Sequence, residues 1–84
     1  MPTTEEYEAR LERLKEYAIR KEKIYADYVG DPAAEVIRAE AITANECYAI
    51  AANITLRKAL QITIGAAQME LDADAERMKV NGDD

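Results

Sequence analysis

The sequence predicts an all-α protein, an antiparallel hairpin of one short and one long helix that assembles into an oligomeric helical bundle. The 84 residues are 49% hydrophobic yet contain only three glycines and two prolines, and alanine is abundant, a composition that favours helices over strands. Apolar residues recur at helical spacing through most of the chain. The segment YVGDPAAE, whose residues are typical of the end of one helix and the start of the next, divides the chain near residue 30. We therefore expect a single domain over 1–84.

The first helix is expected over about 4–29. Thr3 is a suitable N-cap, and Glu6 three residues later completes a capping-box pattern. Gly30 is able to take the left-handed conformation that ends a helix. Asp31 then caps a new helix with Pro32 in its first turn. The turn at 30–31 is short, which makes the two helices antiparallel neighbours.

The second helix is expected over about 32–79, followed by an acidic tail at 80–84. No clear stop precedes Asn81 and Gly82. Gly65 is the interior weak point, because a lone glycine costs about 1 kcal/mol relative to alanine in a helix. The helix therefore either continues through Gly65, with or without a kink, or folds back there so that residues 66–79 form a third helix.

Folding the chain at Gly30 and Asp31 predicts the seam inside the hairpin. Large residues of the first helix face small residues of the second, and Lys21 meets Glu40 at one level. This pair either fixes the register or turns outward to water. The predicted seam residues are Tyr7, Leu11, Leu14, Ala18, Lys21, Tyr25, Tyr28, Ile37, Glu40, Ala44, Cys47, Ala51 and Ile54.

A second apolar stripe remains on the long helix after the seam is assigned. The shorter helix cannot cover it, and a soluble monomer rarely exposes so large an apolar patch. We interpret the stripe as the interface of a homodimer or higher oligomer, or as a binding surface for another protein. Its residues are Ile42, Ala49, Asn53, Leu56, Leu60, Ile64, Ala67, Leu71 and Met78.

Catalytic and cofactor chemistry finds little support in the sequence. The chain has no histidine and one cysteine, Cys47, so histidine-based catalysis and a cysteine zinc site within one chain are excluded. The glycines are isolated, which excludes a phosphate-binding loop. Asn53-Ile54-Thr55 matches the glycosylation pattern, but we expect it inside a helix. The sequence therefore predicts a non-enzymatic protein without cofactor or metal.

Charge and cysteine content limit the partners and the location. The net charge of −6 disfavours binding to nucleic acids and to anionic membranes. Arg57 and Lys58 lie in the middle of the most apolar window, 47–67, which disfavours a membrane span. One unpaired cysteine and no leader-like segment favour the cytoplasm.

Two polar groups have alternative interpretations. Glu46, Asn53 and Arg57 form either a polar network at an interface or its solvated rim. The acids at 70–76 are most simply a solvated helix face, although carboxylates so spaced could also hold Mg²⁺ or Ca²⁺. These acids are Glu70, Asp72, Asp74 and Glu76.

Two functions remain open. The first is self-association and action through protein–protein contacts, carried above all by Leu56, Leu60, Ile64 and Leu71. The alternative is a small acidic inhibitor, of the kind that mobile elements encode, which mimics nucleic acid. Its carboxylates would include those at 70–76 together with Asp83 and Asp84. A regular hairpin also suits a designed bundle, but the irregular composition of 45–71 is unlike an idealised design.

Overall fold

Three α-helices form the part of the protein that the structure describes. The computed structural model describes the backbone of residues 3–82 and the side chains of residues 3–78. The helices are α1 (Thr4–Asp27), α2 (Ala34–Ala52) and α3 (Leu56–Gly82), and the described part contains no strand. The prediction of an all-α protein is therefore confirmed. Asp83 and Asp84 lie outside the described residues.

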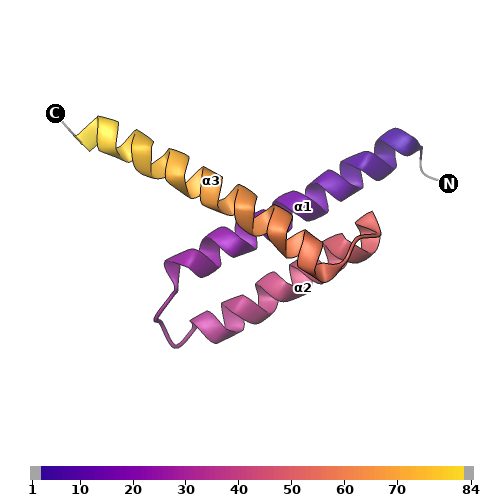
Figure 1. The fold of residues 1–84 in the computed structure, drawn as a ribbon, viewed down its shortest axis with the longest axis horizontal. Helices are drawn as coiled ribbons and strands as arrows, with labels where there is room; N and C mark the ends of the chain where they lie inside the picture. Colours follow the sequence, from indigo (N-terminus) through magenta and orange to yellow (C-terminus); the bar gives the residue numbers. More distant parts are fainter. Residues whose placement is uncertain (1–2, 83–84) are drawn as a thin grey trace.

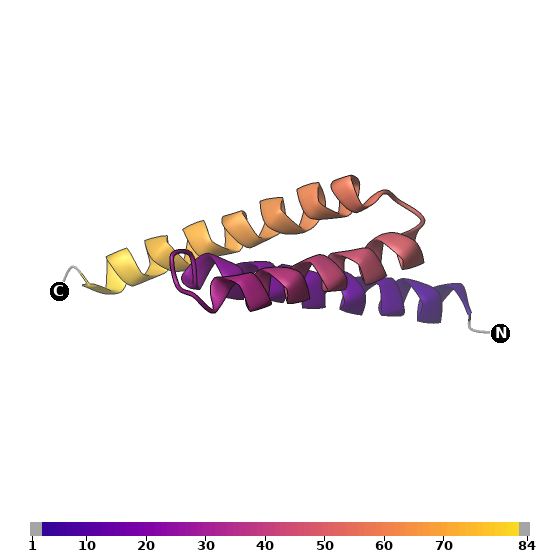
Figure 2. The ribbon, with the colours of Figure 1, turned by 90° about the horizontal axis from the view of Figure 1, so that it is seen from below.

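The helices form two layers. In Figure 1, α1 and α2 lie side by side and run in opposite directions, and α3 crosses α1 obliquely. Figure 2 shows that α3 lies on one side of the layer formed by α1 and α2. The C-terminal half of α3 extends beyond α2 and diverges from α1. One side of the α1–α2 layer is therefore covered by α3, and the opposite side is not.

The ends of α1 follow from local sequence signals. The backbone N–H of Glu6 donates to the Thr3 hydroxyl at 3.1 Å, as the capping pattern predicts. α1 ends at Asp27 rather than at residue 29, and Gly30 takes a positive φ of 91° in the turn. The Asp31 carboxylate accepts from the backbone N–H of Ala33 at 2.8 Å. This contact extends the turn, so that α2 begins at Ala34 and not at the predicted Pro32.

The long second helix predicted over 32–79 is wrong, because the chain turns back at Asn53. This residue has left-handed dihedral angles, φ 58° and ψ 45°, which asparagine tolerates better than most residues. The backbone N–H of Ile54 donates to the Ala49 carbonyl at 3.0 Å, and that of Asn53 donates to the Ile50 carbonyl at 3.2 Å. Together these bonds form a Schellman motif, which ends α2 by satisfying its last carbonyl groups.

The start of α3 explains the Asn53-Ile54-Thr55 segment, which was expected inside a helix. The Thr55 hydroxyl accepts from the backbone N–H of Lys58 at 3.1 Å, an N-cap interaction. Gly65 lies within α3, and a Cβ added there would meet no described atom within 4 Å beyond its own helix backbone and chain neighbours. The chain therefore folds back as a third helix, but at Asn53 and not at Gly65.

Small residues form the centre of the fold. Among residues 3–78, the buried hydrophobic residues are six alanines and one tyrosine, namely Ala18, Ala41, Ala44, Tyr48, Ala49, Ala59 and Ala67. Alanine side chains allow helix backbones to approach closely. Leu14, Ala52, Ile54 and Ile62 are only partly buried and pack against the cluster of Tyr48, Ala49 and Ala59.

The predicted seam needs two corrections, although its charged pair is confirmed. Lys21 Nζ lies 3.0 Å from Glu40 Oε2. Cys47, expected in the seam, is exposed, and Tyr48 is buried in its place. Tyr28, also expected there, lies in the turn after α1 and is 40% exposed. α3 packs on one side of α2. The buried face of α2 is therefore rotated toward α3, compared with the face predicted for a hairpin of two helices.

The molecule is flat and extended for its length. Its principal extents are 54 × 30 × 17 Å and its radius of gyration is 15.0 Å, whereas a compact chain of this length has a radius of about 12 Å. Its accessible surface is 6426 Å², whereas a folded monomer of this mass exposes about 5,000 Å². The single chain thus exposes about 1,400 Å² more surface than is usual for its size.

Candidate interaction surfaces

A polar junction joins all three helices. Asn45 and Thr63 are fully buried, each with 0% exposure. The Thr63 hydroxyl donates to Asn45 Oδ1 at 2.7 Å. The Asn45 amide donates to Glu22 Oε1 at 3.0 Å and to the Ala41 carbonyl at 2.9 Å. The junction fixes α3 against the α1–α2 layer, because a shift of one helix would leave buried polar groups without partners.

Glu22 is the titratable member of this junction. Partial burial raises the pKa of its carboxyl group, and the hydrogen bond from Asn45 opposes that effect. No buried side-chain nitrogen or oxygen atom of the described residues lacks a hydrogen-bond partner. The junction is therefore a saturated structural network, with no free polar group directed at a ligand.

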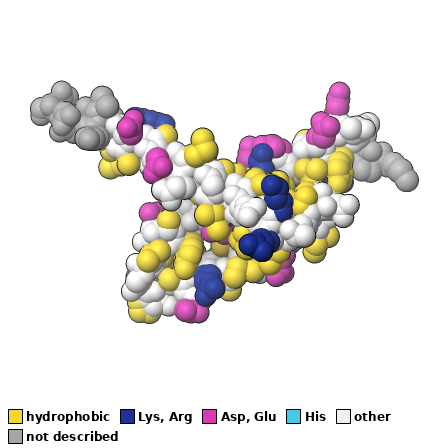
Figure 3. Space-filling view, viewed as in Figure 1, with side chains coloured by type: hydrophobic (Ala, Val, Ile, Leu, Met, Phe, Trp, Pro, Cys, Tyr) yellow, Lys and Arg dark blue, Asp and Glu magenta, His cyan; other side chains and the backbone are white. Residues whose placement is uncertain are grey.

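The residues of the predicted second stripe separate into three groups. Ala49 and Ala67, which were predicted at an interface, are buried inside the chain because α3 folds back. Ile42, Leu56, Leu60 and Leu71 are half-buried. Asn53, Ile64 and Met78 are exposed, and Figure 3 shows hydrophobic side chains at the surface along α3. We use the name α3 stripe for Leu60, Ile64, Leu71 and Met78, which share one edge of α3.

A groove of about 500 Å³ borders the α3 stripe where α1 and α3 diverge. Its apolar lining includes Ile19 and Ile24 of α1 and Leu71 of α3. Its rim is charged, and Lys23 Nζ lies 3.5 Å from Asp74 Oδ2 across the two helices. An apolar floor between charged edges is typical of a surface that binds a protein segment.

A second groove, of about 490 Å³, lies between α1 and α2, and no described residue of α3 lines it. We call this side of the α1–α2 layer the outer face. Val36 and Ile50 are 64% and 82% exposed, and Val36, Thr43 and Ile50 follow one another at intervals of seven residues. The groove is lined by, among others, Leu14, Tyr17, Lys21, Val36, Glu40 and Cys47.

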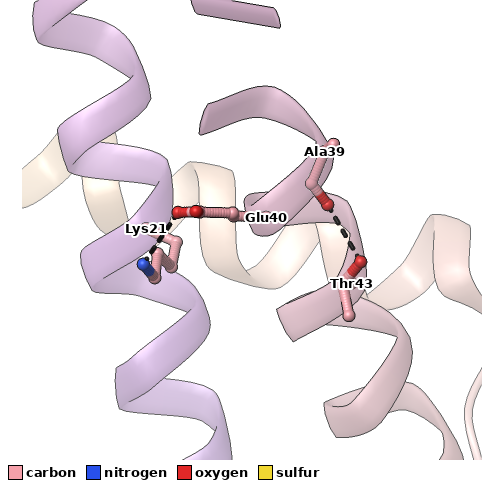
Figure 4. A network of polar contacts seen from close by, with 4 residues as sticks. All are labelled: Lys21, Ala39, Glu40 and Thr43. Carbon is pink, nitrogen blue, oxygen red and sulfur yellow. Dashed lines mark hydrogen bonds and ion pairs between the residues drawn. The ribbon is translucent and has the colours of Figure 1, made fainter. Parts of the chain in front are cut away.

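The charged pair Lys21–Glu40 lies at the outer face. Figure 4 shows the Lys21 side chain of α1 reaching Glu40 of α2, one turn from Thr43, whose hydroxyl donates to the Ala39 carbonyl at 3.0 Å. The Lys21 ammonium group also lies 5.4 Å from the centre of the Tyr17 ring. The hydrogen bond to Glu40 is the largest effect that raises the pKa of Lys21.

The outer face was not predicted as a surface. Lys21, Glu40 and Cys47 were expected in contacts inside the hairpin, and Val36 and Ile50 had no predicted role. The seven-residue spacing of Val36, Thr43 and Ile50 was a signal that could have identified the face. The side chains of the other polar group, Glu46, Asn53 and Arg57, are all exposed.

The acidic run of α3 is partly engaged in local contacts. Asp74 is approached by Lys23 at 3.5 Å and by Arg77 at 3.7 Å. Gln68 donates to the Asp72 carboxylate at 2.9 Å. Within the part of the chain that is described, no three metal-ligating side chains come together in a candidate metal site.

Comparison with known proteins assigns the chain to no family. No protein-family model, curated protein or solved structure matches the chain. Among the described residues, no helix has the length and apolar character needed to cross a membrane. A functional interpretation therefore depends on the surfaces themselves.

Proposed function

We propose that this protein is a non-enzymatic helical module that self-associates and acts through protein–protein contacts. One observation carries the proposal. Among residues 3–78, no leucine, isoleucine, valine or methionine side chain is buried, whereas six alanines are. The largest sources of hydrophobic stabilisation in the chain are thus left partly or wholly in water.

The energetics of a small domain make this arrangement costly for a monomer. Full burial of a leucine or isoleucine side chain stabilises a fold by about 1.5–3 kcal/mol, and alanine contributes much less. A chain of this size is near the lower limit for a self-sufficient core. Association with a second copy supplies the burial that the three helices do not supply to each other.

The exposed area supports the same proposal. The chain exposes 6426 Å², which exceeds the usual value for its mass by about 1,400 Å². A standard protein–protein interface covers about 800 Å² on each partner. The excess is therefore large enough for one full interface and leaves further surface for another contact.

The α3 stripe is the surface that we propose for a protein partner of the assembled molecule. Ile64 and Met78 are 49% and 74% exposed, and Leu71 lines the neighbouring groove between α1 and α3. Four acidic and two basic side chains border this groove, and this excess of negative charge favours a partner whose contact surface is basic at its rim. We propose a cytoplasmic location, with no cofactor.

Sedimentation equilibrium of the full chain tests self-association directly. We expect a mass of at least twice 9.4 kDa. We also expect the melting temperature to rise with protein concentration, because association stabilises the folded state by mass action. A monomer whose melting temperature is independent of concentration would contradict the proposal.

Site-specific photo-crosslinking in the cells that make the protein tests the α3 stripe. A photoreactive residue at Ile64 is expected to give a discrete adduct with a different protein. The same residue at Ala73, an exposed position on α3 outside the stripe, is the matched control. Equal labelling at both positions, or none at Ile64, would remove the assignment of the stripe to a partner.

A further inference from the structure

The outer face of the α1–α2 layer has the shape of a helix-binding surface. Its groove lies between two helices and has small residues, among them Ala39, Thr43 and Ala44, along the α2 side. Val36 and Ile50 stand at either end of the α2 row and are 64% and 82% exposed. Apolar and small residues at seven-residue intervals form the contact line of packed helices.

The excess surface area is large enough for contact with a second copy of the chain. The excess of about 1,400 Å² over a folded monomer of this mass exceeds what a standard dimer covers on each partner. The outer face is also an open side of the fold, since α3 covers only the opposite side of the layer (Figure 2). A second α1–α2 layer would cover it with a surface of the same length and width.

The charges on the outer face determine how two copies meet. Among the described residues, the only charged side chains that line its groove are Lys21 of α1 and Glu40 of α2, and they lie at one level, 3.0 Å apart. When two α1–α2 layers pack face to face in a symmetric dimer, the twofold axis runs either parallel or perpendicular to the helices. With the parallel axis, α1 packs on the partner's α2. With the perpendicular axis through this level, α1 packs on the partner's α1, so that the two Lys21 side chains face each other and the two Glu40 side chains do the same.

We propose that two chains pair through their outer faces about a twofold axis parallel to α1 and α2, so that Lys21 faces the partner's Glu40. Each Glu40 then lies near two lysines and each Lys21 near two glutamates. The two layers together form a four-helix bundle, in which every helix is antiparallel to its neighbours. α3 stays outside on both copies, which leaves the α3 stripe accessible. This inference rests on the proposed self-association and specifies its surface.

Two matched variants test the face. Ile50→Asp changes the outer face and Ile64→Asp changes the α3 stripe, at side chains that are 82% and 49% exposed in the single chain. Circular dichroism confirms that each variant is helical. In sedimentation velocity, Ile50→Asp is expected to reduce the mass to that of one chain, and Ile64→Asp is expected to keep the wild-type mass.

Cys47 supplies a second readout, since its thiol lies at the outer face. Alkylation by N-ethylmaleimide is expected to be about tenfold slower in the wild-type dimer than in Ile50→Asp, the effect of covering an otherwise open side chain. If Ile50→Asp keeps the wild-type mass and alkylation rate, the outer face is not the contact, while self-association itself stands. A wild-type protein that is monomeric overturns both proposals.

A charge exchange tests whether the Lys21–Glu40 level lies in the contact. Lys21→Glu is expected to weaken dimerisation by at least about tenfold, because close charge pairs across an interface are coupled by about 1.5 kcal/mol or more. The double variant Lys21→Glu/Glu40→Lys is expected to regain the wild-type mass, since it restores every opposite-charge contact. A folded double variant that remains monomeric would contradict this contact. The orientation is tested in a Cys47→Ser background, where a mixture of Lys21→Cys and Glu40→Cys chains is expected to form the mixed disulfide on oxidation. A disulfide between two Lys21→Cys chains would contradict the parallel axis.

Discussion

The two sides of the α1–α2 layer have opposite characters. The side that faces α3 has small and polar residues, with Asn45 and Ala49 at 0% and 4% exposure, whereas the outer face carries Val36 and Ile50 at 64% and 82%. Small residues permit the close approach of α3, and the buried polar junction fixes its position. Larger aliphatic residues on the outer face contribute only when another surface covers them. One side of the layer thus fixes the position of α3, and the other side is available to stabilise an association between molecules.

The largest expected effect comes from overfilling the side that faces α3. Ala59 of α3 is 0% exposed and packs with Tyr48 and Ala49. Ala59→Leu is expected to destabilise the fold by about 3 kcal/mol, because a packed core has no room for the added carbons. Urea denaturation measures this change. Ala73→Leu, at an exposed position of the same helix, is the control, and equal effects of the two variants would show that α3 is not held closely.

Removal of the polar junction is expected to have the next largest effect. Asn45→Ala leaves the Thr63 hydroxyl and the Glu22 carboxylate without their shared partner, at a cost of about 2 kcal/mol. The free energy of unfolding of Asn45→Ala, Thr63→Val and the double variant gives the coupling between the two residues. Strictly additive effects would mean that the Asn45–Thr63 hydrogen bond contributes nothing to the attachment of α3.

The turn between α2 and α3 is expected to respond more weakly. Asn53→Ala places an ordinary side chain at a φ of 58° and is expected to cost about 1 kcal/mol. Asn53→Gly is the matched control, because glycine adopts this conformation without a steric cost. Thermal unfolding monitored by circular dichroism distinguishes the variants. If alanine stabilised the protein relative to glycine, a continuous helix through this segment would be favoured instead.

The smallest expected effect is a pH dependence that originates at Glu22. Burial raises the pKa of this carboxyl group in the folded protein, so the folded state binds the proton more tightly than the unfolded state does. The contribution of Glu22 to stability is therefore full below the unfolded pKa and is lost as pH rises through the folded pKa.

Glu22→Gln tests this sign, because the amide oxygen is still able to accept from Asn45. As the pH rises from the unfolded-state pKa of Glu22 to its folded-state pKa, the variant is expected to lose less stability than wild type. The difference between the two losses is expected to be under about 1 kcal/mol after solvent screening. Melting temperatures measured over the mildly acidic range up to neutral pH give the comparison. Identical slopes for both proteins would contradict a role for Glu22 in the pH dependence.

The helical class, the start of α1 and the turn after it were determined by the sequence alone, because their causes are local. Thr3 caps α1 through a bond to Glu6, and Gly30 takes the positive φ of the turn that follows α1. The pairing of Lys21 with Glu40 also followed from the short turn, since the turn sets which residues of α1 and α2 lie at one level. The exposed members of the α3 stripe were recognised from helical periodicity.

Only the tertiary structure decided where the third helix begins and which apolar residues it covers. Asn53 and Thr55 are compatible with both a helix interior and a stop-and-start turn, so local preference does not choose between them. The choice depends on contacts made after folding, such as the bond between Asn45 and Thr63, 18 residues apart. Those contacts bury Ala49 and Ala67 within the chain and leave the outer face open. Periodicity identifies the apolar side of a helix, but long-range packing determines which molecule covers it.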